Sequence, residues 1–186
     1  MKIPILDQQD PILRLHAKEV AEADIGSKKI HTVLSRMKKA LYSQEDGVAI
    51  AAPQIGESLR IFIVSGKALA MTRKNKRAKK DIDADEIEEE FSDLVFINPV
   101  ITKLSKKKSS MEEGCLSVRW LYGEVERSTK ATVRAYDEQG KKFEMGGTDL
   151  MAQIFQHETD HLDGVLFTDK AENIRDLPPS DSEDEE

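Results

Sequence analysis

The chain has 186 residues, a length that suits one domain with a well-buried core and is short for two. Its 28 basic and 35 acidic residues give a net charge of −7, which argues against DNA or general nucleic-acid binding, because such proteins need excess positive charge. A lone cysteine excludes an intramolecular disulfide, and neither a signal peptide nor a membrane span is evident. We therefore expect a soluble, cytoplasmic protein with no membrane partner.

The first predicted helix covers residues 28–44, where apolar residues recur at three- and four-residue steps, the spacing of one buried face. Residues 59–65 and 93–101 are rich in β-branched and aromatic residues and are predicted strands. Between them, residues 73–90 contain a basic block and then an acidic block. With so few apolar groups, this charged insertion is expected to be a solvated loop or a short exposed helix. An RNA- or ribosome-contacting role for its basic half is the alternative.

The second half of the chain predicts a hairpin and another helix. Residues 131–137 and 141–145 flank a Glu-Gln-Gly turn and form the hairpin. Thr148 or Asp149 can cap the helix that follows. The tail at 171–186 is acidic and interrupted by proline, and we expect it to be disordered. The inner stripe of the predicted helix is Leu150, Ile154, His157 and His161.

This helix contains the pattern HExxH, with His157 and His161 four residues apart and Glu158 between them. On a helix the two rings lie one turn apart on the same face and can converge on one ion, while the carboxylate exchanges a proton with water. The alternative is that both histidines are surface or satisfied core residues at this spacing by chance. The apolar stripe weakens that interpretation, because unpaired imidazoles are costly to bury.

Two histidines do not complete a catalytic metal site, which usually takes three protein ligands. In the extended pattern HExxHxxGxxH, Gly164 is present, but Phe167 stands where the third histidine should be. A downstream glutamate is limited to Glu172 or the acidic tail, and neither lies on a second predicted helix. Cys115 is the soft, high-affinity candidate upstream and is the predicted third ligand.

Three segments together resemble the signature motifs of the peptide deformylase family: GVAIAAPQIG at 47–56, EGCLS at 113–117 and QHETDHLDGVLF at 156–167. With the opening DPILR and the strand FINPVI, the resemblance spans most of residues 4–169. It implies an α+β fold in which a central HExxH helix packs against antiparallel or mixed β-sheets. Residues 1–170 would form a single catalytic domain that includes the charged insertion.

The resemblance also implies an activity. Such an enzyme is a metal-dependent hydrolase that removes the N-formyl group from the N-terminal formylmethionine of newly made polypeptides and releases formate. Its partners would be formylmethionyl nascent peptides and the ribosome near the exit tunnel. Two alternatives stay open: an HExxH metallopeptidase with a third ligand other than Cys115, and a non-catalytic deformylase-like protein that binds formyl peptides or ribosomes.

The resemblance implies that three residues of this sequence bind the metal: Cys115, His157 and His161. The resemblance implies one divalent ion, Fe²⁺ first, with Zn²⁺, Ni²⁺ or Co²⁺ able to take the same place. Cys115 is then expected to be a thiolate because it binds the metal, and not a nucleophile.

Glu158 would act as general base and acid, while the side-chain amide of Gln54 and the backbone N–H of Leu116 would stabilise the oxyanion. Glu113 and Arg127 resemble the structural ion pair of the family, and Gly114 would let its loop approach the metal. For the apolar residues among the substrate contacts named next, packing in the core is the alternative role. Substrate contacts are assigned to Gly47, Val48, Ala49, Tyr122, Leu150 and Ile154.

The first motif departs from the family pattern GxGLAAPQ. Ala49 replaces the second glycine and Ile50 replaces the leucine. If that glycine has a positive φ or a close backbone neighbour, Ala49 would reduce stability or narrow the cleft. We therefore expect this position to affect substrate binding and rate, and the metal ligands to be independent of it.

Overall fold

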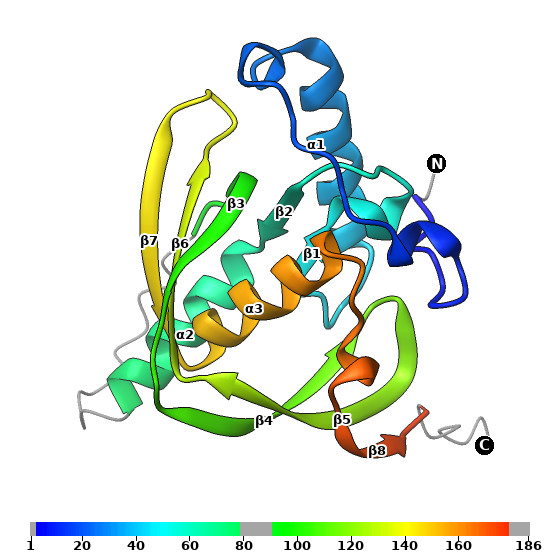
Figure 1. Ribbon diagram of the computed structural model, residues 1–186, viewed down its shortest axis with the longest axis vertical. Helices are drawn as coiled ribbons and strands as arrows, with labels where there is room; N and C mark the ends of the chain where they lie inside the picture. The colour runs from blue at the N-terminus through cyan, green and yellow to red at the C-terminus, as the bar shows by residue number, and fades with distance from the viewer. Residues whose placement is uncertain (1–2, 79–90, 179–186) are drawn as a thin grey trace, which may run out of the picture.

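A computed structural model describes residues 3–78 and 91–178 (Figure 1). Its helices are α1 (Lys28–Tyr42), α2 (Gly66–Ala78) and α3 (Leu150–Leu162), and short 3-10 turns lie at Pro11–Arg14, Glu22–Asp24, Ala52–Ile55 and Phe167–Asp169. Its strands are β1 (Ala49–Ala51), β2 (Ile61–Val64), β3 (Leu94–Leu104), β4 (Lys108–Cys115), β5 (Val118–Ser128), β6 (Lys130–Tyr136), β7 (Lys142–Thr148) and β8 (Glu172–Asp176).

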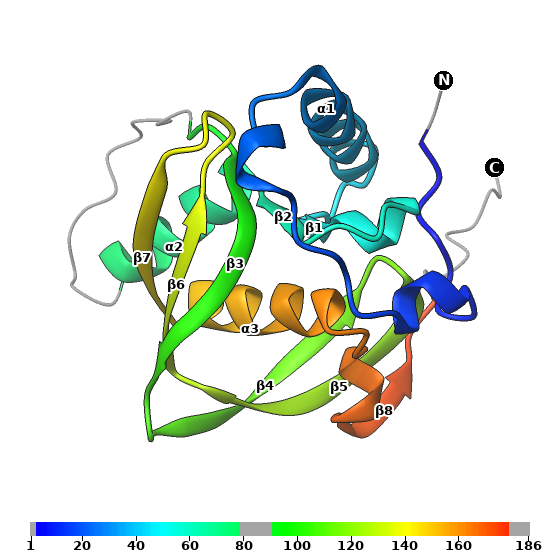
Figure 2. The ribbon, with the colours of Figure 1, turned by 45° about the horizontal axis from the view of Figure 1, so that its top comes forward.

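The strands form two antiparallel sheets, one in the order β1-β2-β3-β6-β7 and one in the order β4-β5-β8. Helix α3 lies between the two sheets, and α1 lies outside β1 and β2 (Figure 2). The predicted α+β fold with a central HExxH helix is confirmed. This arrangement brings the end of β4 next to the face of α3 that carries His157 and His161, which is where the site forms.

Most predicted elements are confirmed. The apolar face of α1 is buried, and Ser27 caps its start by accepting a hydrogen bond from the backbone N–H of Ile30 at 3.4 Å. The predicted strands and hairpin correspond to β2, β3, β6 and β7. Helix α3 begins directly after Asp149, although the Asp149 side chain does not make the capping hydrogen bond that the sequence suggested.

An aromatic cluster fixes α3 against the larger sheet. Phe62 and Phe96 stack with ring centres 4.5 Å apart, and the Phe155 ring meets Phe96 edge-on at 5.4 Å. All three are fully buried. On the other side, Gln156 accepts from the backbone N–H of Ser128 at 3.0 Å and donates to its carbonyl at 2.9 Å. Helix α3 is therefore held from both sheets, so its histidines have little freedom to move.

The C-terminal prediction needs a correction. The disordered tail was expected to begin at 171, but Glu172–Asp176 form β8, which pairs with β5. All five residues of β8 are exposed, so no apolar pattern marks the strand, and backbone pairing forms it. Residues 179–186 lie outside the described part of the chain.

The charged insertion expected at 73–90 begins inside α2, and its residues 79–90 lie outside the described part of the chain. Within the described ranges, no helix is long and apolar enough to cross a membrane.

Candidate active site and metal centre

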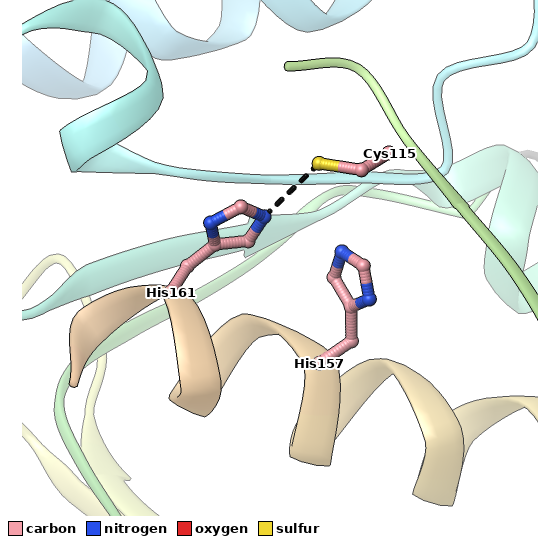
Figure 3. A group of neighbouring side chains, drawn as sticks. All are labelled: Cys115, His157 and His161. Carbon is pink, nitrogen blue, oxygen red and sulfur yellow. Dashed lines mark hydrogen bonds between the residues drawn. The ribbon is translucent and has the colours of Figure 1, made fainter. Parts of the chain in front are cut away.

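Three side chains converge at the end of β4. Cys115 is the last residue of β4, and His157 and His161 point toward it from α3 (Figure 3). Their ligand atoms all lie within 4.8 Å of one another, and the Cys115 Sγ is 3.2 Å from Nε2 of His161. The two residues that the HExxH spacing placed on one face therefore meet the one predicted upstream ligand.

These residues fit a single divalent ion. Nδ1 of His157 is engaged by Glu113 at 2.9 Å, so its Nε2 is left to face the other two ligands. Among the described residues, Oε2 of Glu158 and Nδ1 of His161 are buried without a hydrogen-bond partner. Such atoms are rare in folded proteins, and the unpartnered Oε2 of Glu158, which lines the same cavity as Cys115 and His157, is typical of a site that holds an ion or water. One thiolate and two imidazoles form a donor set that suits Zn²⁺ or Fe²⁺.

The Cys115 thiol is poised to ionise. Burial by itself raises its pKa, but the charges and hydrogen bonds of His161 and His157 outweigh burial and lower the pKa to about 5. The backbone N–H of Ser117 also donates to Sγ at 3.4 Å. The sulfur is therefore a thiolate at neutral pH, the form in which cysteine binds metals.

The pKa of Glu158 is shifted in the opposite direction from that of Cys115. Its side chain is buried, and burial raises its pKa to about 7 although His157 and His161 act to lower it. Glu158 also lines the cavity described below. A carboxyl group with a pKa near neutrality can both accept and return a proton, which is what a general base and acid must do.

Behind the ligands runs a chain of buried ion pairs. Glu113 is hydrogen-bonded to Nδ1 of His157 and accepts two hydrogen bonds from Arg127, at 2.8 and 3.0 Å. Arg127 also donates to Asp160 on α3 at 2.6 Å. The predicted ion pair between Glu113 and Arg127 is thus present, and Asp160 extends it to a network of three charged residues. A carboxylate on the far nitrogen of a ligand histidine fixes the ring orientation.

Gln54 is oriented by its own backbone neighbourhood. Its Oε1 accepts from the backbone N–H of Ala51 at 2.8 Å, so its NH₂ end turns toward β4 and donates to Ser117 Oγ at 3.2 Å and Cys115 Sγ at 3.5 Å. Gln54 is 2% exposed. Leu116 follows Cys115 in the β4–β5 turn and lines the same cavity. Both proposed oxyanion donors therefore lie beside the metal ligands.

A cavity of about 290 Å³ opens from these residues to the surface. Of the six predicted substrate contacts, five line it: Val48, Ala49, Tyr122, Leu150 and Ile154. Gly47 is buried and does not line the cavity, and a Cβ at this position would lie 2.9 Å from Leu41. Sequence reasoning missed seven other lining residues: Asp46, Glu112, Val118, Arg119, Trp120, Leu121 and Gln153. Trp120, the only tryptophan of the chain, lies five residues after Cys115 and was the one available signal.

Ala49, the residue that departs from the family pattern, has an unstrained backbone. Among the described non-glycine residues, positive φ values occur only at Asn98, Asp149 and Asn173. Ala49 pairs with Val64 in an ordinary antiparallel ladder, and its methyl group is buried at the cavity wall. The residue therefore places a methyl group at the cavity wall without backbone strain.

Gly114 is required for a reason that the sequence did not reveal. A Cβ at this position would lie 2.7 Å from Cε1 of Tyr122, on the neighbouring strand. Real Cβ atoms do not approach that closely, so the glycine makes room for the tyrosine ring at the cavity wall. The glycine thus connects the metal loop to a predicted substrate contact.

Comparison with known proteins agrees with this site. A family model for polypeptide deformylases matches residues 2–176. Peptide deformylase 1A, chloroplastic/mitochondrial, of Arabidopsis thaliana is 39% identical over 166 residues, covering 89% of this chain and 60% of the plant protein. The peptide deformylase of Desulforudis audaxviator is 36% identical over 173 residues, covering 91% of this chain and 94% of that protein.

Solved structures show the same fold. The class I type b peptide deformylase of Acinetobacter baumannii with bound Met-Ala-Ser superimposes with a TM-score of 0.75 and 32% identity, covering 91% of this chain and 98% of that one. An actinonin complex of a Synechococcus elongatus peptide deformylase gives 0.72 and 30% identity, covering 92% and 79%. The motifs, the fold and the converging ligands agree, and the chain belongs to the polypeptide deformylase family.

Proposed function

We propose that the chain removes the N-formyl group from the N-terminal formylmethionine of nascent polypeptides by hydrolysis, releasing formate. The observation that carries this proposal is the convergence of Cys115, His157 and His161 beside a buried Glu158. A formamide is a stable amide, so its hydrolysis near neutral pH needs an activated water and donors aimed at the developing oxyanion. All of these groups line or adjoin one cavity.

The residues of the chain divide the chemistry among them. A divalent ion bound by the three ligands would acidify water and polarise the formyl oxygen. Glu158 takes the proton as the water oxygen adds to the formyl carbon, and returns it to the methionine nitrogen as the C–N bond breaks. Gln54, through its NH₂ group, and the N–H of Leu116 donate to the oxyanion. The products are formate and a free amino terminus, so all atoms of water and formamide are accounted for.

The substrate side chain is proposed to enter the apolar part of the cavity. Val48, Leu150 and Ile154 line it without a polar group, which suits the flexible, apolar methionine side chain. Leu150 and Val48 are partly exposed, which favours a role as pocket walls beside their packing role. The Met-Ala-Ser complex of the Acinetobacter enzyme supports the proposal that a peptide beginning with methionine occupies this cavity.

Fe²⁺ is the proposed native metal, on the resemblance of the motifs and on the mixed sulfur and nitrogen donor set. The decisive measurement is hydrolysis of a formyl-Met peptide by protein prepared anaerobically with Fe²⁺, with formate and free amine as readouts. Release of both supports the proposal. Absence of turnover with Fe²⁺, Zn²⁺, Ni²⁺ and Co²⁺ alike would favour a non-catalytic formyl-peptide binder. Cleavage of an internal peptide bond would favour the metallopeptidase alternative.

Action near the ribosome and a cytoplasmic location stay predictions. For the first, deleting residues 73–90 and measuring deformylation of full-length nascent chains is the test. Unchanged activity on nascent chains would remove the RNA- or ribosome-contacting role of that segment.

A further inference from the structure

Trp120 lies at the mouth of the cavity whose inner end holds the metal ligands. It is the only tryptophan in the sequence, it lines the cavity, and 37% of its surface is exposed. Large aromatic side chains are usually buried, and one that is exposed at the rim of a binding site offers a rigid apolar contact surface. None of the catalytic steps proposed above uses it.

Arg119 holds this indole in place. Its guanidinium carbon lies 4.9 Å from the centre of the Trp120 ring, a cation–π contact. The guanidinium in turn donates to both carboxylate oxygens of Asp46, at 2.6 and 3.2 Å, and to Oε1 of Gln44 at 2.9 Å. Asp46 and Gln44 belong to the loop between α1 and β1, so Arg119 joins that loop to the start of β5. The ring is thus preorganised by contacts from another part of the chain.

Strand β8 and the residue after it hold the backbone around Trp120 in place. The backbone N–H of Leu177 donates to the carbonyl of Trp120 at 3.0 Å, and Leu121 pairs with Asp176 in the ladder between β5 and β8. Opposite residues of an antiparallel pair share a face, so Leu177 lies on the Trp120 side of the sheet. Leu177 is 51% exposed, and it extends the apolar surface beyond the indole.

The charges around the mouth are already paired. Asp46 is bound by Arg119, and Glu112 is bound by Arg175 of β8. Paired charges attract a charged substrate residue weakly, because the field of each is largely cancelled by its partner. The feature that Trp120 presents to a passing peptide is therefore apolar.

We propose that Trp120, held by Arg119, forms a subsite for an apolar or aromatic side chain at the second or third residue of the substrate. The inference rests on the proposed function. With the formyl group at the metal ligands and the methionine side chain among Val48, Leu150 and Ile154, the rest of the peptide leaves through the mouth and passes the indole. The chain thereby selects among nascent polypeptides by their second or third residue. Trp120 contacts substrate, and Arg119 is a positioning residue.

The test compares kcat/KM for formyl-Met-Ala-Ser, formyl-Met-Phe-Ser and formyl-Met-Ala-Phe with the metal-loaded protein. Since aromatic pairs gain free energy beyond burial, the wild type should prefer at least one phenylalanine peptide by about 3- to 10-fold. Trp120→Ala should remove that preference, and Trp120→Phe should keep part of it. Arg119→Ala should reduce it by loosening the indole. Leu104→Ala is the matched control, because Leu104 is 49% exposed on β3 and is absent from the cavity lining.

A binding measurement tests the subsite without turnover. Because Trp120 is the only tryptophan, its fluorescence reports on this position alone. Product peptides Met-Phe-Ser and Met-Ala-Phe should change the emission of the wild-type protein at lower concentration than Met-Ala-Ser does. Equal rates and equal binding for all three peptides would overturn the subsite while leaving the proposed function intact, and so would an equal loss on all peptides in Trp120→Ala. No turnover of any formyl peptide by the wild type would instead overturn the proposed function.

Discussion

Replacing Glu113 with glutamine should destabilise the fold and weaken metal binding together. The carboxylate is 2% exposed, accepts two hydrogen bonds from Arg127 at 2.8 and 3.0 Å, and is hydrogen-bonded to Nδ1 of His157 at 2.9 Å. Glutamine keeps the shape of the side chain but removes its charge. The buried guanidinium of Arg127 then keeps Asp160 as its ionic partner.

Two measures of the same interactions of Glu113 agree on the expected loss of stability. Removing one partner of a buried ion pair costs about 3–5 kcal/mol, and the remaining contact with Asp160 places this case at the lower end. Burial by itself raises the pKa of Glu113, but hydrogen bonds from His157 and Arg127 outweigh burial and lower it from 4.5 to about 2. A lowering of that size corresponds to ~3 kcal/mol of stability at neutral pH.

The sign of the pH dependence follows from the lowered pKa. The folded protein holds the Glu113 carboxylate ionised more strongly than the unfolded chain does, so its contribution is complete above the unfolded pKa of about 4.5. The contribution is lost as the pH falls from there toward the folded pKa of about 2. Glu113→Gln should therefore show a shallower loss of stability with acid over this window than the wild type.

Urea unfolding of the metal-loaded and chelator-treated protein measures the stability, and competition with a chromophoric chelator measures metal affinity, which should fall about 10- to 100-fold. Glu112→Gln is the matched control, because the adjacent Glu112 is 60% exposed and its ion pair with Arg175 lies at the surface. The control should change stability by less than about 1 kcal/mol. Equal effects of the two substitutions would refute the reasoning.

Three further predictions concern the site. Glu158→Ala should lower kcat about 10²- to 10⁴-fold while the protein keeps its metal, as measured by formate release and elemental analysis, and retained turnover would contradict its role. Gly114→Ala should destabilise the protein by about 1–3 kcal/mol, because its Cβ would meet the Tyr122 ring, and Tyr122→Ala in the same chain should restore most of that loss in urea unfolding. The Fe²⁺ form should lose activity in air faster than the Zn²⁺ or Ni²⁺ form, because oxidation of either the iron or the Cys115 sulfur ends activity, and equal decay of the forms would argue against this.

Local patterns along the chain determine much of this protein. Helix α3 was predictable because its apolar residues and both histidines repeat within a few turns, and that period is set by the backbone itself. The convergence of Cys115 with the two histidines was predictable for a different reason, since Phe167 left the downstream position without a ligand atom. The structure stacks Phe167 on His157 instead, with ring centres 6.3 Å apart.

Contacts between distant segments were decided by the tertiary structure alone. Asp160 joins the ion pair of Arg127 and Glu113, and Arg119 reaches back to Asp46, because sheet packing brings these positions together. Strand β8 forms by backbone pairing with β5 and has no apolar period that a sequence could reveal. Periodicity reports which face of an element is buried, but it does not report what that face meets, since loop closure and register between strands act over the whole chain. The residues of the candidate metal site were therefore foreseeable, and the surroundings that orient them and shape the mouth of the cavity were not.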